Sequence, residues 1–300
     1  MGLAPAPLAL GNLAQRFLVA VVAVPILLFL LHYHRPEPTW AVIFIASLLA
    51  MNEFFAMTLP KEDRRAALVM GGLACLGFYW LDPIPLLVLD QSKTMLQVAE
   101  WAKYGGTTVT LILAVIVPGL FYLFKFREIP TVAARYTATV AGIVYAGFLT
   151  TYLAKLKLID PHMVGDTVVI VLLVAWVADT GGYFAGRFLG KAKLYEAVSP
   201  KKTWAGAYGG LAGSLLGVAV LKIAFADWLT WLDVVLIAIP GGILGQMGDL
   251  AESLIKRAVG VKDSGALLPG HGGILDRIDA VLFIAPYVYT YLTIKFTFGF

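Results

Sequence analysis

The sequence predicts an all-α, polytopic integral membrane protein. Of its 300 residues, 60% are hydrophobic and 14% are charged, and the mean hydropathy is +0.82. A soluble domain of this length would have too few polar side chains to cover its surface. The apolar residues also gather in runs close to the ~20 residues that a helix needs to cross a bilayer. Together these observations predict about nine transmembrane helices.

The predicted spans follow the apolar runs in chain order. The first run, residues 17–31, is not followed by a small-x-small cleavage site, so we expect a retained span and not a secretory signal. The segment 83–103 contains two prolines and scattered charge, and we expect it to lie at the membrane interface without crossing. The eight further spans are expected at residues 40–59, 66–81, 107–124, 136–153, 167–188, 204–226, 231–255 and 280–297.

The distribution of charge predicts the orientation. With the N-terminus inside, alternate connections place the larger share of the 23 Lys and Arg residues on the cytosolic side, as the positive-inside rule requires. The net charge of +4 fits loops near anionic headgroups, and no basic patch with interleaved aromatics indicates nucleic acid. Cys75 is the only cysteine, which excludes a disulfide framework and a cysteine metal cluster.

The two halves of the chain differ in polarity. Residues 1–158 carry few polar groups within spans and are expected to form a scaffold. Glu53 is the exception: a carboxylate within a span is costly, which makes it a minor site candidate. Residues 159–300 gather the polar groups and are expected to be the catalytic half, with cytosolic loops, of a single membrane domain.

The densest polar segment is SLIKRAVGVKDSGALLPGHGGILDRID, residues 253–279. Its glycines at 270, 272 and 273 allow consecutive backbone N–H groups to converge on an anion. Asp276 and Asp279 are three residues apart and would share one helix face, as suits Mg²⁺ held between protein and phosphates. The alternative is a solvated loop between two apolar helices.

Asp179 lies within the sixth predicted span and precedes TGGYFAGRFLGK. An ionised carboxylate at that depth needs a hydrated cavity or a cation, so it is a candidate site residue. The alternative is a structural pair with Arg187 or with a neighbouring helix. The glycines at 182, 186 and 190 recur every four residues, which favours close helix packing over ligand binding.

Two further stretches suit phosphate chemistry. The basic turn at residues 199–203 offers Lys201 and Lys202 as a triphosphate clamp, although such lysines also serve as ordinary positive-inside anchors. The eighth span ends in GDLAESLIKR, where Asp249 and Glu252 share one face and a carboxylate would meet Asp276. No second histidine or cysteine accompanies His271, so a zinc site is not expected.

These stretches resemble the diagnostic segments of CDP-diacylglycerol synthases, also called phosphatidate cytidylyltransferases. The run S-x-I-K-R-x4-K-D-x-G-x2-L-P-x-H-G-G-I-x-D-R-I-D matches at its fixed positions, and DTGGYFAGRFLGK, SPKKTWAG and GDLAESLIKR extend the likeness to residues 179–279. The family commonly has Glu where this chain has Ala205 and often has His where this chain has Ala192.

The resemblance implies a membrane nucleotidyltransferase of phospholipid biosynthesis that joins CTP and phosphatidic acid, giving CDP-diacylglycerol and pyrophosphate. It implies Mg²⁺, with K⁺ suggested as a second cation. The expected partners are CTP, phosphatidic acid and the lipid bilayer, with a homodimer left open. Two alternatives remain. A CTP-dependent polyprenol-type kinase would be distinguished by its products. A secondary transporter is disfavoured by the absence of a paired inverted repeat.

The expected site divides into three groups of residues. The catalytic group is Asp249, Asp276, Lys256, Arg257 and Arg277, and the metal ligands are Asp249, Asp276 and Asp279. The substrate-binding group is Asp179, Ser199, Lys201, Lys202, Ser253, Lys262, Asp263, Gly270, His271, Gly272 and Gly273. Because phosphatidate is already an anion, we expect direct in-line attack on the α-phosphorus of CTP without a strong general base.

Overall fold

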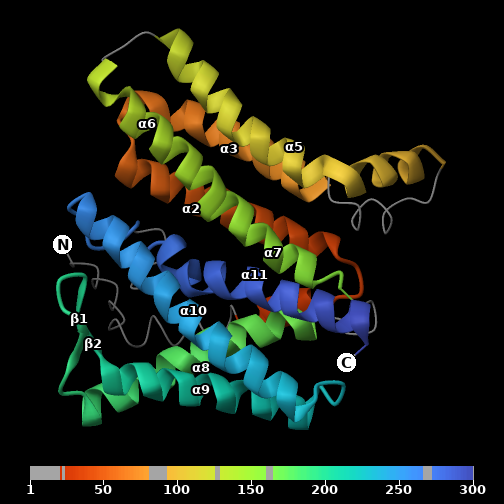
Figure 1. Ribbon diagram of the computed structural model, residues 1–300, viewed down its shortest axis with the longest axis vertical. Helices are drawn as coiled ribbons and strands as arrows, with labels where there is room; N and C mark the ends of the chain where they lie inside the picture. The colour runs from red at the N-terminus through yellow and green to blue at the C-terminus, as the bar shows by residue number, and fades with distance from the viewer. Residues whose placement is uncertain are drawn as a thin grey trace, which may run out of the picture.

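The computed structural model describes residues 21, 24–80, 93–125, 129–159, 165–265 and 272–299. Within these ranges the chain is a bundle of long helices with one small hairpin (Figure 1). Seven helical segments of the described chain are long and apolar enough to cross a membrane. The prediction of an all-α, polytopic membrane protein is therefore confirmed, whereas the count of nine spans and the cytosolic N-terminus stay predictions.

Two predicted spans account for the difference in number. Residues 24–32 are helical, but the rest of the first predicted span lies outside the described residues. Helix α3 (Lys61–Trp80) is present where a span is expected. It falls outside the seven because its N-terminal end carries Lys61, Glu62, Asp63, Arg64 and Arg65.

The amino-terminal half contains α2 (Glu37–Thr58), α3 and α5 (Lys93–Lys125). It continues through α6 (Ile129–Gly142), a π-helical turn η1 (Ile143–Phe148) and α7 (Leu149–Leu156), which follow one another without a break. Aromatic side chains fill its core: Phe55 and Phe78 are fully buried, and Phe54 and Tyr79 nearly so.

Residues 93–103, expected at the membrane interface without crossing, are the first turns of the 33-residue helix α5, and the part of α5 that is long and apolar enough to cross a membrane begins at Gly105. The stretch is helical because both prolines, at 83 and 85, precede it, and good helix formers such as Leu96, Ala99 and Glu100 follow them. Residues 83–92 lie outside the described part of the chain.

The carboxy-terminal half contains α8 (Asp166–Leu189), α9 (Trp204–Ala224), α10 (Trp231–Ala258) and α11 (Leu275–Phe298). Glycines bring α8 and α9 together: a Cβ added to Gly206 would lie 3.0 Å from the carbonyl oxygen of Gly182 and 3.4 Å from the Cα of Gly186. Any larger side chain would separate the two backbones. The predicted close helix packing is present at Gly182 and Gly186, whereas Gly190 follows the end of α8 and its added Cβ would meet Gly186 and Thr203.

A hairpin joins α8 to α9. Strand β1 (Lys193–Tyr195) pairs antiparallel with β2 (Ser199–Thr203). The sequence analysis placed residues 199–203 in a turn, and this is wrong because their backbone is extended and pairs with β1. Thr203 then caps α9, its Oγ1 accepting from the N–H of Gly206 at 3.1 Å.

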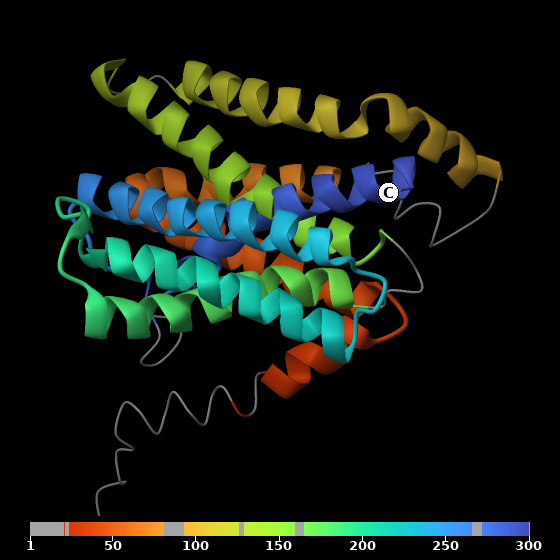
Figure 2. The same cartoon turned by 60° about the horizontal axis from the view of Figure 1, so that its bottom comes forward.

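The hairpin marks one end of the bundle. The C-terminal end of α10 lies at this end, as do the end of α5 and the start of α6 (Figures 1 and 2). Helices α10 and α11 run between the α8–α9 pair and the amino-terminal half (Figure 1). Polar segments far apart in the sequence are thereby collected at one end.

Candidate active site

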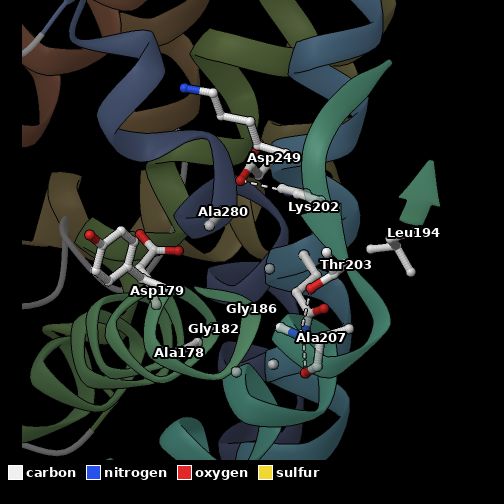
Figure 3. A pocket seen from close by; sticks show the side chains of 18 of the residues that line it. Ala178, Asp179, Gly182, Gly186, Leu194, Lys202, Thr203, Ala207, Asp249 and Ala280 are labelled. Carbon is white, nitrogen blue, oxygen red and sulfur yellow. Dashed lines mark hydrogen bonds and ion pairs between the residues drawn. The ribbon is translucent and has the colours of Figure 1, made fainter. Parts of the chain in front are cut away.

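A cavity of about 490 Å³ lies where α8, the hairpin, α9, α10 and α11 converge (Figure 3). Its wall changes character along α8. Val174 and Ala175 line it together with Ile284 of α11, and farther along come Asp179, Tyr183 and Arg187. The cavity therefore joins an apolar end to a polar, charged end.

An ion pair crosses the polar end. Lys202 of β2 places its Nζ 2.6 Å from Oδ2 of Asp249 on α10 (Figure 3). The two side chains are 25% and 35% exposed, so solvent and ligands have access to both. Oδ1 of Asp249 also accepts from the hydroxyl of Ser253 at 3.4 Å. The structure thus brings together the predicted lysine clamp and the predicted metal carboxylate.

Asp179 faces the same cavity. Within the described residues its carboxylate has no hydrogen-bond or ion-pair partner, while Arg187 donates to the hydroxyl of Tyr183 at 2.7 Å. The alternative of a structural pair between Asp179 and Arg187 is therefore not realised. Asp179 is within electrostatic reach of Lys202, Arg277 and Asp249.

The inner side of the site holds a second pair of acids. Asp279 interacts electrostatically with Asp249, Glu252 and Asp179. Glu252 is 1% exposed, and its Oε1 has no hydrogen-bond partner within the described structure. Several like charges at this depth require compensation by cations.

Asp276 is held in a different way from Asp249. Its Oδ1 accepts from Lys256 Nζ at 2.6 Å, and its Oδ2 accepts from the backbone N–H groups of Ser264 at 3.0 Å and Gly273 at 2.9 Å. Lys256 is buried and also donates to Glu252 at 2.7 Å. Lys256, predicted to be catalytic, therefore joins the end of α10 to the start of α11.

The predicted metal trio of Asp249, Asp276 and Asp279 does not converge on one point. Among the residues that the structure describes, no three acidic, histidine or cysteine side chains are placed to hold a metal ion by themselves. The reason is that Asp249 is drawn to Lys202, whereas Asp276 is drawn to Lys256 and the loop backbone. A cation bound through fewer carboxylates plus substrate oxygens remains the prediction.

The other predicted site residues lie around this centre. Arg257 donates to the carbonyl of Val261 at 3.0 Å, and Arg277, Lys201, Lys262 and Asp263 are exposed. Gly272 has φ +79°, the left-handed backbone expected of the glycine turn, and Gly273 follows it. Ser199 is partly buried on β2. Gly270 and His271 lie outside the described residues.

Sequence reasoning missed several contributors. Tyr183 and Gln246 line the cavity, and Gln246 donates to the carbonyl of Ala207 at 3.2 Å. Gly206 and Gly210 of α9 also form part of the cavity wall. Ser264 was not singled out, although it contacts Asp276. The hydroxyl of Ser264 donates to the Glu53 carboxylate at 3.1 Å, and Glu53 is the minor candidate that its charge within a span indicates.

Comparison with known proteins shows the family. The sequence matches the profile described as the Cytidylyltransferase family over residues 14–295. A Bacillus subtilis protein named phosphatidate cytidylyltransferase is 31% identical over 284 residues, covering 94% of this chain and 98% of the relative.

Two other relatives carry the same name and match over shorter stretches. The Brucella suis biovar 1 protein is 44% identical over 154 residues, which is 50% of this chain and 55% of that protein. The Synechocystis sp. protein is 36% identical over 200 residues, 58% of this chain and 67% of the relative. The chain thus spans about half the length of the Brucella relative. On the profile and the near full-length Bacillus match, the chain belongs to the cytidylyltransferase family.

Proposed function

We propose that this protein transfers the cytidylyl group of CTP to phosphatidic acid, giving CDP-diacylglycerol and pyrophosphate in the membrane. The relatives' shared name supports this substrate pair. The observation that carries the proposal is the graded cavity, apolar near Val174 and Ile284 and cationic near Lys202 and Arg187. Val174 and Arg187 are about 20 Å apart along α8, which is enough to separate acyl chains from phosphates.

The reaction needs positioning more than proton transfer. A phosphatidate oxygen attacks the α-phosphorus of CTP. The bond between the α-phosphorus and the oxygen that bridges to the β-phosphorus breaks, and pyrophosphate leaves with the electron pair. Lys201, Lys202 and Arg187 neutralise phosphate charge at the cavity mouth. No described side chain is required as a nucleophile.

The proposal includes Mg²⁺, with K⁺ as a second cation. The donor set fits: Asp249 lines the cavity, Asp179 has no partner in the described structure, and Glu252 Oε1 is buried without one. Hard oxygen ligands and one or two carboxylates suit Mg²⁺ that is also bound to substrate phosphates. When bound, Mg²⁺ would neutralise charge on the leaving pyrophosphate. Asp249 and Asp179 are the residues that would hold it.

Product identification tests the reaction. Purified protein is mixed with CTP, dioleoyl phosphatidic acid and Mg²⁺, and the lipid and phosphate products are identified by mass spectrometry. CDP-diacylglycerol and pyrophosphate in equal amounts are expected. Lipid phosphate with CDP, formed when a polyprenol replaces phosphatidic acid, would instead indicate phosphoryl transfer to an alcohol, the chemistry of the kinase alternative. An Asp249→Asn preparation controls for contaminating host enzyme.

We propose that the site end of the bundle faces the cytosol, where CTP is found. In a Cys75→Ala background, cysteines at Glu196 and Lys262 should resist an impermeant maleimide added to intact cells. A cysteine at Asp227, in the connection between α9 and α10 at the other end, should react. Labelling at Glu196 or Lys262 with protection at Asp227 would reverse the orientation.

A further inference from the structure

Glu53 links the amino-terminal half to the loop that precedes α11. It belongs to α2, and its side chain is 7% exposed. Its Oε1 accepts from the backbone N–H of Ile274 at 3.0 Å. Its Oε2 accepts from the N–H of Leu275 at 2.9 Å and from the hydroxyl of Ser264 at 3.1 Å. Glu53, more than 200 residues away in sequence, thus contacts the described residues on both sides of this connection: Ser264 on one side, and Ile274 and Leu275 on the other.

These bonds replace a helix cap that α11 lacks. The residue at its N-cap position is Ile274, which has no side-chain acceptor, and no side-chain cap bond is made there. The first N–H groups of a helix need acceptors, and a negative charge there interacts favourably with the helix dipole. Glu53 provides both. It therefore fixes where α11 begins.

Asp276 lies in the first turn of α11. The hydrogen bonds that fix the start of α11 therefore also fix the position of this site residue. Ser264 donates its N–H to Asp276 and its hydroxyl to Glu53, and its Oγ accepts from the N–H of Asp276 at 3.3 Å. Asp276 in turn pairs with Lys256. Glu53 thus contacts Ser264, Ser264 contacts Asp276, and Asp276 contacts Lys256.

Two glycines of the loop leave room for this carboxylate. A Cβ added to Gly265 would lie 2.6 Å from Oε1 of Glu53. A Cβ on Gly273 would overlap both Oε2 of Glu53 and Oγ of Ser264. The chain is therefore shaped around Glu53 at both of these positions, which a surface loop would not require.

We propose that Glu53 is a positioning residue of the active site: it anchors the loop between α10 and α11 so that Asp276 and Lys256 are held for the reaction. The proposal rests on the proposed function for its catalytic consequence, but the anchoring itself is independent of it. It also gives the amino-terminal half a part in the chemistry beyond that of a scaffold.

Glu53→Gln is the decisive variant because it preserves size. One carboxylate oxygen becomes an NH₂ group, which then faces the N–H of Leu275 in one orientation and the N–H of Ile274 in the other. Either way a donor meets a donor. Displacement of reacting groups by about 1 Å costs on the order of 100-fold in rate, so we expect a fall of that size in kcat with less than threefold change in KM for CTP.

Two measurements are made on each variant. Turnover of CTP and phosphatidic acid reports the chemistry, and hydrogen exchange followed by mass spectrometry reports the loop. In Glu53→Gln we expect faster exchange in peptides covering 262–276, with α2, α8 and α9 unchanged. Ser264→Ala removes one link and should cost less. The double variant should be little worse than Glu53→Gln alone, because both act through the same contacts.

Glu37→Gln is the matched control, since Glu37 lies at the other end of α2 and contacts Arg35 at 3.8 Å. It should leave both measurements unchanged. The proposal is wrong if Glu53→Gln turns over within threefold of the parent, or if exchange rises throughout the protein and not in the loop. If the parent makes no CDP-lipid, the proposed function fails, and the exchange experiment still decides whether Glu53 anchors the loop.

Discussion

The two halves of the molecule each contain a carboxylate of the helical bundle, but the surroundings of the two carboxylates differ. In the amino-terminal half Asp63 is fully buried, paired with Lys125 and with Arg135 at 3.4 Å. In the carboxy-terminal half Asp179 faces a cavity with no partner in the described chain. The first arrangement neutralises its charge within the protein, whereas the second leaves a charge available to a ligand.

Side-chain packing also differs between the two halves. Aromatic rings fill the amino-terminal core, as with Phe78 and Phe148, whose centroids are 4.8 Å apart. Glycines bring α8 and α9 into backbone contact, and the same glycines border the cavity. Large side chains give a filled scaffold, while small ones give close helices beside an open volume. The comparison teaches that a carboxylate must be judged by its surroundings, and four variants test the differences between the two halves in charge and in packing.

The largest effect is expected for Asp249→Asn. The variant removes the charge of a carboxylate that would hold Mg²⁺ at the substrate phosphates, so turnover should fall about 1,000-fold. Thermal unfolding in detergent should be unchanged, because the side chain is 35% exposed and its ion pair contributes little to stability. Asp227→Asn, at the opposite end, is the control. Turnover within tenfold of the parent would remove Asp249 from the site.

Asp63→Asn should have the converse effect. It leaves Lys125 and Arg135 without their buried partner and should destabilise the fold by about 3 kcal/mol, measured by denaturant unfolding in detergent. Activity per folded molecule should stay within twofold. The adjacent Glu62→Gln, at a side chain 49% exposed, should cost less than about 1 kcal/mol. Equal losses from both variants would contradict the distinction between buried and exposed pairs.

Gly213→Ala tests the glycine contact between α8 and α9. The new Cβ would overlap the carbonyl oxygen of Val177, and overpacking of this kind costs about 2 kcal/mol. Gly119→Ala in α5 is matched, since its Cβ would lie 3.6 Å from the nearest atom, the ring of Tyr136. That variant should keep or slightly raise stability. If the two variants unfold alike, the helices are not limited by backbone contact.

Thr203→Val should have the smallest effect. It removes the cap of α9, and its loss should cost about 1 kcal/mol. Thr230→Val removes the cap of α10, where Thr230 and Asp233 bond reciprocally, at a similar cost. Only Thr203 also lines the cavity, so only its variant should raise KM for CTP. A KM change in Thr230→Val would show that capping, and not contact with the cavity, sets affinity.

The sequence by itself determined the membrane class, the positions of most spans, the family and the chief polar residues of the site. Hydropathy depends only on residues that are adjacent in the sequence. An apolar run such as 204–226 therefore predicts a span whichever helices it packs against. The family stretches likewise lie within contiguous segments. Lys202 and Asp249 were therefore named before any contact between them was known.

Only the tertiary structure decided how those residues pair. Spacing along a helix predicts that Asp249 meets Asp276, but an ion pair depends on which helices face each other, and here Asp249 pairs with Lys202 while Asp276 pairs with Lys256. Glu53 shows the limit most clearly. Its charge within a span marked it as unusual, yet its partners Ser264, Ile274 and Leu275 are supplied by a loop over 200 residues away. A hydrogen bond requires atoms within about 3 Å, and the packing of α2 against α11 brings them there.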